Sequence, residues 1–93
     1  DVVIKNPTHF AVALKYDHQK QGAPAVVAKG QDKLALKIIE IAEKNEVAVV
    51  ENIPLARALY AAVEVGMEIP KEFYNPVAEI LAHIYSKNKK DLN

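Results

Sequence analysis

The spacing of the apolar residues changes along this chain, and that change restricts its fold more than any other feature. Residues 1–5 are mostly β-branched, and in residues 10–16 the large side chains alternate with two alanines and a lysine. A period of two is typical of a β-strand, and here it leaves small residues on the face that a helix can cover closely. Residues 25–29 form a third short apolar run, which ends at a glycine. We therefore predict three strands in the first third of the chain.

From residue 32 onward the apolar period becomes helical. The residues expected on the buried stripe of this helix are Leu34, Ile38, Ile41 and Ala42. Residues 47–51 then form a nearly continuous apolar run, which favours a central strand covered on both faces. The strand at 25–29, this helix and the strand at 47–51 fit a βαβ crossover.

Two further helices are predicted in the last part of the chain. The first begins at residues 52–54, because a proline suits the first turn of a helix, and its inner residues are Leu55, Leu59 and Val63. The second covers residues 71–86, with inward residues Phe73, Val77, Ile80, Leu81 and Ile84. The order of elements predicts an α/β fold class, a small single domain over residues 1–93 with a mixed sheet of about four strands surrounded by helices.

The composition excludes several classes of function. Twelve Lys and Arg balance twelve Asp and Glu, so the chain has no net positive charge with which to bind nucleic acid. It has no cysteine, which excludes disulfides and thiolate metal sites, and its histidines lack partners at metal-ligand spacing. No cofactor and no metal is therefore expected. The apolar runs are far shorter than the roughly 20 residues of a membrane helix, and the first residue is Asp rather than Met, so we expect a domain cut from a longer protein.

The turn Asn6-Pro7-Thr8-His9, between the first two predicted strands, has unusual chemistry. Pro7 has no N–H group, so the usual attack of the next backbone nitrogen on an asparagine side chain is blocked. The side-chain nitrogen of Asn6 can instead attack its own backbone carbonyl carbon, close a succinimide and expel the nitrogen of Pro7. Nucleophile and electrophile belong to one residue, which lowers the barrier. Thr8 and His9 lie beside the bond and can assist proton transfer. The same residues also fit an uncut β-turn.

Several segments resemble the FlhB/YscU family of self-cleaving export-switch proteins in bacterial type III secretion systems. They are the Asn-Pro-Thr-His turn, residues 10–16, residues 23–30, residues 54–60 and Ile69-Pro70. The resemblance covers essentially the whole chain, and it is closer to the flagellar branch than to the virulence branch.

The resemblance implies a function and a location. Members of this family carry a membrane part before a cytoplasmic domain such as this one, at the cytoplasmic face of the bacterial inner membrane. The implied reaction is one self-cleavage between Asn6 and Pro7, which leaves residues 1–6 as a strand paired with the remainder, 7–93. Asn6 cyclises, Pro7 is the leaving side, and Thr8 and His9 support the turn; the domain is not a turnover enzyme. Cleavage changes export from rod and hook components to filament components. The implied partners are other export-apparatus proteins, the hook-length control protein and the exported substrates.

A second candidate site is a shallow apolar patch. Ala23-Pro24 is apolar within a polar loop, and together with Ala78 and Leu81 on the last helix it could capture an arriving export substrate. Plain packing of the loop on the helix is the alternative.

Three other functions remain open at this stage. One is the same role in a virulence secretion system, and another is an uncut structural domain that binds partners. The third is a metabolite-binding α/β enzyme, which the lack of a glycine-rich loop or a serine nucleophile motif disfavours.

Overall fold

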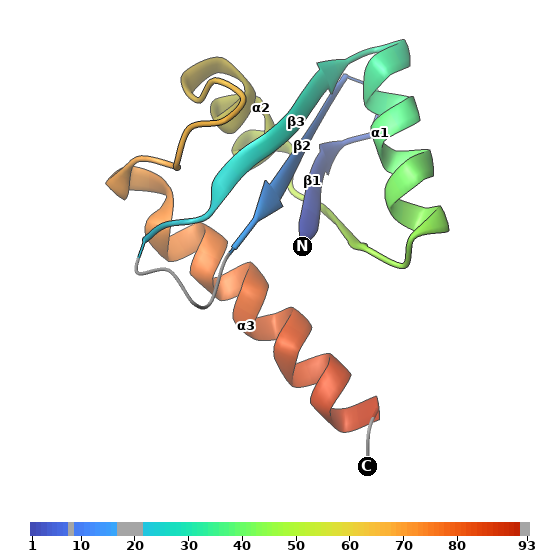
Figure 1. The fold of residues 1–93 in the computed structure, drawn as a ribbon, viewed down its shortest axis with the longest axis vertical. Coiled ribbons are helices and arrows are strands. Elements are labelled where there is room, and N and C mark those ends of the chain that lie inside the picture. The colour runs from blue at the N-terminus through green and yellow to red at the C-terminus, as the bar shows by residue number, and fades with distance from the viewer. Residues whose placement is uncertain (8, 17–21, 92–93) are drawn as a thin grey trace.

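The computed structural model describes residues 1–7, 9–16 and 22–91, which build a sheet and three α-helices (Figure 1). In chain order the elements are β1 (Val2–Asn6), β2 (Phe10–Lys15), β3 (Ala25–Gln31), α1 (Lys33–Lys44), β4 (Ala48–Glu51), α2 (Ile53–Ala62), the short 3₁₀ helix η1 (Lys71–Phe73) and α3 (Tyr74–Asp91). This order confirms the predicted α/β class. Across these ranges, none of the helices combines the length and the apolar character needed to cross a bilayer.

The sheet is mixed and has the strand order β3-β2-β1-β4. β1 pairs with β2 antiparallel and with β4 parallel, and β2 pairs with β3 antiparallel. The prediction of a central position for residues 47–51 is wrong, because β4 is an edge strand. Its apolar run has another cause: Val47 and Val49 pack toward α1, whereas Ala48 and Val50 pack toward the opposite core. An edge strand that is covered on both faces reads in the sequence like a central one.

Each face of the sheet has its own hydrophobic core. α1 covers one face, where Val3 and Ala11 meet its buried side chains, and α2 and α3 cover the other face (Figure 1). The small face of β2 predicted from its alternation is the face beneath α1. The larger core combines strand residues with residues from α2, η1, α3 and the loop before η1, namely Val2, Ile4, Val12, Leu14, Val26, Leu55, Ala56, Leu59, Val63, Ile69, Phe73 and Val77.

The buried face of α1 lies about one residue away from the predicted stripe. Ala42 of the predicted stripe is buried, together with Ala35 and Ile39, and the predicted Ile38 is half-buried against the same core. Leu34, in contrast, is 55% exposed and Ile41 is 49% exposed. The reason is a contact at the start of the helix, where the Leu34 side chain packs against Gly30 of β3. A Cβ atom at Gly30 would come within 2.5 Å of the Leu34 Cγ atom. Leu34 therefore covers Gly30 at the sheet margin rather than facing the sheet.

Both helices predicted in the last part of the chain are present, but the helix predicted over residues 71–86 is divided into η1 and α3, and α3 continues to Asp91. Asn52 caps α2, since its side-chain oxygen accepts a hydrogen bond from the Leu55 N–H at 3.1 Å. The predicted inner residues of α2 are buried, Phe73 and Val77 are buried, and Ile80, Leu81 and Ile84 of α3 are half-buried against the same core. Gly66 has a φ of 93° in the turn after α2, a conformation that favours glycine.

Candidate functional site

The connection between β1 and β2 is a four-residue turn that begins at Asn6. Asn6 pairs with Phe10 across the two strands, and the His9 N–H donates a hydrogen bond to the Asn6 carbonyl oxygen at 3.0 Å. Pro7 lies at the second position, where its fixed φ suits a β-turn. Thr8, which the sequence assigns a supporting role, lies outside the described residues. The hydrogen bond places a donor on the carbonyl group whose carbon the side chain of Asn6 would attack.

Asn6 is buried, and this is unusual for its type. Its exposed fraction is 8%, and among the described residues it is the only polar or charged one that is buried. By the alternation of β1, its side chain lies on the same face as Val2 and Ile4, toward α2. Burying an amide group costs free energy unless the amide finds a compensating interaction.

Backbone hydrogen bonds hold the chain on both sides of the Asn6–Pro7 bond. Before the bond, the Asn52 N–H donates to the Lys5 carbonyl at 3.0 Å, which joins β1 to the start of α2. After the bond, the Asp32 N–H donates to the His9 carbonyl at 2.9 Å, which joins the turn to the start of α1. The turn is therefore fixed by two junctions that lie far away in the sequence.

The side chains around the turn form a small aromatic and polar cluster. The imidazole of His9 is exposed, and its centre lies 6.3 Å from the ring centre of Phe10. The ring of Phe10 lies 4.7 Å from that of Tyr60 on α2, and the Tyr60 hydroxyl donates to the Gln31 Oε1 at 3.0 Å. Lys29 donates through its Nζ to the Tyr60 carbonyl at 2.8 Å. These contacts hold α2 against β2 and β3 beside the turn.

The chain contains a second Asn-Pro pair, Asn75-Pro76, to which the sequence reasoning gave no role. It lies in the first turn of α3, where proline is well tolerated. Asn75 is exposed, in contrast to Asn6. The two pairs have the same covalent structure, but they differ in burial and in backbone conformation.

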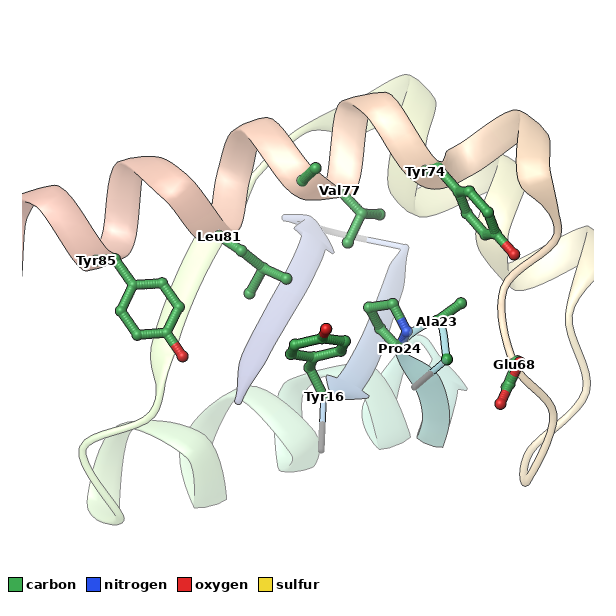
Figure 2. A pocket seen from close by; sticks show the side chains of 10 residues that line it. Tyr16, Ala23, Pro24, Glu68, Tyr74, Val77, Leu81 and Tyr85 are labelled. Atoms are coloured by element: carbon green, nitrogen blue, oxygen red, sulfur yellow. The ribbon is translucent and has the colours of Figure 1, made fainter. Parts of the chain in front are cut away.

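The structure brings the four residues of the predicted patch together in one groove. Ala23 and Pro24, before β3, face Ala78 and Leu81 of α3 across a groove of about 520 Å³. Figure 2 shows Tyr74 and Tyr85 at the two ends of the stretch of α3 that lines this groove, with Tyr16 on the opposite wall. The sequence reasoning missed these three tyrosines. The signal for Tyr74 and Tyr85 was the spacing of residues 74, 78, 81 and 85, which places four side chains on one helix face. Tyr16 had no such signal, because only the fold brings the end of β2 to this helix.

The described residues contain no group of three or more His, Cys, Asp and Glu side chains that could hold a metal ion. His9 and His83 are exposed and lie on different elements. His18 lies outside the described residues.

Comparison with known proteins finds relatives over nearly the whole chain. The sequence profile of the FlhB HrpN YscU SpaS family matches residues 1–84. The flagellar biosynthetic protein FlhB of Bacillus subtilis is 57% identical over 90 residues, covering 97% of this chain and 25% of that protein. FlhB of Escherichia coli K12 is 52% identical over 85 residues, covering 91% of this chain and 22% of that protein. The chain spans about a quarter of the length of these curated relatives.

Solved structures share the fold. The cytoplasmic domain of FlhB from Shewanella putrefaciens superimposes with a TM-score of 0.92 at 40% identity, covering 98% of this chain and 70% of that one. The C-terminal domain of EscU, carrying an asparagine-to-alanine mutation, superimposes with a TM-score of 0.81 at 42% identity, covering 84% and 78% of the two chains.

Proposed function

The chain belongs to the FlhB HrpN YscU SpaS family, and on that premise we propose that it is the self-cleaving cytoplasmic domain of a flagellar type III export-apparatus protein. One observation carries the proposal. A buried asparagine, followed by a proline, has its own carbonyl oxygen held by a backbone donor. The domain cuts itself once between Asn6 and Pro7 and then works through contacts with other proteins. It is not a turnover enzyme, because the reacting residue is consumed.

The cleavage proceeds by cyclisation of Asn6. The side-chain nitrogen loses a proton and forms a bond to the Asn6 carbonyl carbon, and the carbonyl oxygen takes up the negative charge. The His9 N–H, 3.0 Å from this oxygen, stabilises that charge as the donor of an oxyanion hole does. The bond from the carbonyl carbon to the Pro7 nitrogen then breaks, and this nitrogen accepts a proton. Residues 1–6 are left with a terminal succinimide, which water opens later.

The two pieces stay together because the cut strand is an interior strand. β1 keeps its hydrogen bonds to β2 and to β4 when the covalent link is lost. Val2, Val3 and Ile4 are each no more than 2% exposed, so separation of the pieces would expose both cores. Cleavage therefore relaxes the turn and leaves the sheet in place.

The groove between the start of β3 and α3 gives the cut domain a surface for recognition. Its residues are mainly aromatic and aliphatic, and one carboxylate, that of Glu68, lies at its margin. This chemistry suits an apolar segment of an exported rod or hook subunit. The hook-length control protein and other export-apparatus proteins are further proposed partners. The change from rod and hook export to filament export follows cleavage, at the cytoplasmic face of the inner membrane.

One comparison supports the flagellar version of this proposal, and another supports the importance of the Asn6 turn. The curated relatives named FlhB are 48–58% identical to the chain, whereas among the solved structures the FlhB domain, at 40%, and the EscU domains, at 39–42%, are equally similar to it. The EscU structures include replacements of an asparagine, of the proline directly after it and of a histidine two positions beyond the proline. That spacing equals the spacing of Asn6, Pro7 and His9 in this chain.

The decisive experiment is the intact mass of the purified, denatured protein, with Asn75→Ala as the matched control for Asn6→Ala. The unchanged chain and Asn75→Ala should both yield a fragment that begins at Pro7. Asn6→Ala should stay whole, since it has no side-chain nitrogen to cyclise. Fragmentation of Asn6→Ala at the same bond would exclude cyclisation. An unchanged chain that never fragments would favour the uncut structural domain.

A further inference from the structure

Asp32 lies at the junction of β3 and α1, and its backbone is hydrogen-bonded to the turn that contains the Asn6–Pro7 bond. Resting on the proposed self-cleavage, we infer that Asp32 is a positioning residue: its backbone N–H fixes the peptide of His9, and His9 in turn fixes the carbonyl group of Asn6. Asp32 touches none of the reacting atoms. It acts through the conformation of its own main chain.

Both polar backbone groups of His9 are engaged. Its N–H donates to the Asn6 carbonyl at 3.0 Å, and its C=O accepts from the Asp32 N–H at 2.9 Å. A turn that is closed only by the hydrogen bond between its first and last residues can still rotate at the peptide that follows it. A second bond from outside the turn restricts that motion and keeps the donor aimed at the oxygen that gains charge. Preorganised donors of this kind contribute to catalysis because they need no reorganisation during the reaction.

The backbone of Asp32 is strained. Its φ is 54° and its ψ is −118°, a combination that glycine tolerates and that other residues rarely adopt. The strain has a local cause, because Asp32 belongs to two elements. Its N–H extends the pairing of β3 with β2 by one residue beyond the Gln31–Phe10 pair, because it donates to the His9 carbonyl. Its C=O accepts from the Leu36 N–H at 3.1 Å and so begins α1. Only a sharp reversal at Asp32 allows both bonds.

The side chain of Asp32 contributes little to this arrangement. It is exposed, it makes no hydrogen bond that caps α1, and it accepts a long hydrogen bond from the Gln31 Nε2 at 3.5 Å. The turn therefore requires the conformation of Asp32 rather than its carboxylate. Glycine should serve as well as aspartate at this position, and a β-branched residue, which resists positive φ, should serve badly.

The other end of α1 offers a matched control. Glu46 also has a positive φ, 58°, and is also exposed. It follows the last turn of α1, where its N–H donates to the Glu43 carbonyl at 3.2 Å. A helix of 12 residues is about 18 Å long, so Glu46 is far from the cleaving turn. Any general effect of strain or stability on the reaction should appear equally at both positions.

The experiment compares Asp32→Val and Glu46→Val, with Asp32→Gly and Glu46→Gly as rescue variants. Cleavage is timed from pulse-labelled synthesis, and Tm is measured in parallel. Both valine variants should lower Tm, but only Asp32→Val should slow cleavage, by about 10- to 100-fold. Asp32→Gly should cleave at the unchanged rate. If Asp32→Val does not fold, Asp32→Ala and Glu46→Ala repeat the comparison with a smaller perturbation. Equal cleavage rates in the two members of a pair would overturn the role in cleavage.

A second readout separates this inference from the proposed function. In an Asn6→Ala background, which cannot cyclise, hydrogen exchange of the His9 amide should be faster with Asp32→Val and unchanged with Glu46→Val. Unchanged exchange in both would refute the positioning contact itself. A protein that never cleaves would refute the proposed function, and the exchange result would still decide whether Asp32 holds the turn.

Discussion

The two Asn-Pro pairs of this chain share their chemistry and differ in their surroundings. Asn6 is buried at the end of an interior strand, and its carbonyl oxygen accepts a hydrogen bond within a tight turn. Asn75 is exposed in the first turn of α3, where its backbone is helical and its side chain is open to water. A solvated amide samples many rotamers, whereas a buried amide is restricted to few. The dipeptide alone therefore does not fix the geometry that the proposed cleavage needs.

The surroundings of the two pairs also differ in the kind of contact that they offer. The turn at Asn6 is built from backbone hydrogen bonds, which fix the geometry of one peptide group. The helix that begins near Pro76 is built for side-chain contact, and it lines the groove with Tyr74, Ala78 and Leu81 (Figure 2). Changes in one region should therefore leave the proposed function of the other intact.

Unfolding should have the largest effect on the difference in cleavage rate between the two Asn-Pro pairs. In the native protein we expect cleavage at Asn6–Pro7 to exceed cleavage at Asn75–Pro76 by at least about 100-fold, because only the first pair is held for attack. In a strong denaturant both bonds lose their surroundings, so both should react at comparable, much slower rates. Quantitative mass spectrometry of the two possible fragments over time measures both rates in one sample.

The alternative outcome of that experiment would also be informative. Thr8 and His9 follow the first pair directly in the sequence, whereas Val77 and Ala78 follow the second. A preference for Asn6–Pro7 that survives full denaturation would show that these neighbours act locally, without the fold. The burial of Asn6 and its anchoring hydrogen bonds would then lose their explanatory role.

A charge in the groove should have the next largest effect, by weakening the binding of an exported subunit without changing cleavage. Ala78 is exposed and lines the groove, so Ala78→Asp places a carboxylate there without disturbing the core. We expect binding of a purified rod or hook subunit to weaken by about tenfold, which corresponds to about 1.4 kcal/mol. The cleavage rate should not change. Calorimetric titration and the intact-mass assay measure the two quantities.

The control for this change is Ala58→Asp. Ala58 is also exposed and helical but lies on α2, away from the residues that line the groove. It should bind the subunit as the unchanged protein does. Equal binding by all three proteins would remove the groove as a docking site and would leave the cleavage mechanism untouched.

The sequence predicted the elements of this fold better than their positions. Alternation and helical periodicity located the strands and helices, and the turn chemistry singled out Asn6. Neither pattern contains strand order, so β4 was wrongly expected at the centre of the sheet. The stripe of α1 was displaced because the contact of Leu34 with Gly30 is a tertiary contact. The positive φ of Asp32 was equally invisible, since aspartate before a helix reads as an ordinary cap.

Replacing each proline with alanine should have the smallest effect on the difference between the two Asn-Pro pairs. Pro7→Ala frees the backbone of the turn and restores an N–H that can attack the Asn6 side chain. If the proline constraint contributes about 1 kcal/mol, cleavage should slow roughly fivefold, and deamidation of Asn6 should appear beside it.

Pro76→Ala should leave cleavage at Asn6–Pro7 unchanged, and it should shift the stability by no more than about 1 kcal/mol because α3 can begin without a proline. Peptide mapping separates the cleaved, deamidated and intact forms. If Pro7→Ala cleaves at the unchanged rate without deamidation, the proline is dispensable, and the hydrogen-bonded, buried asparagine alone distinguishes the first pair from the second.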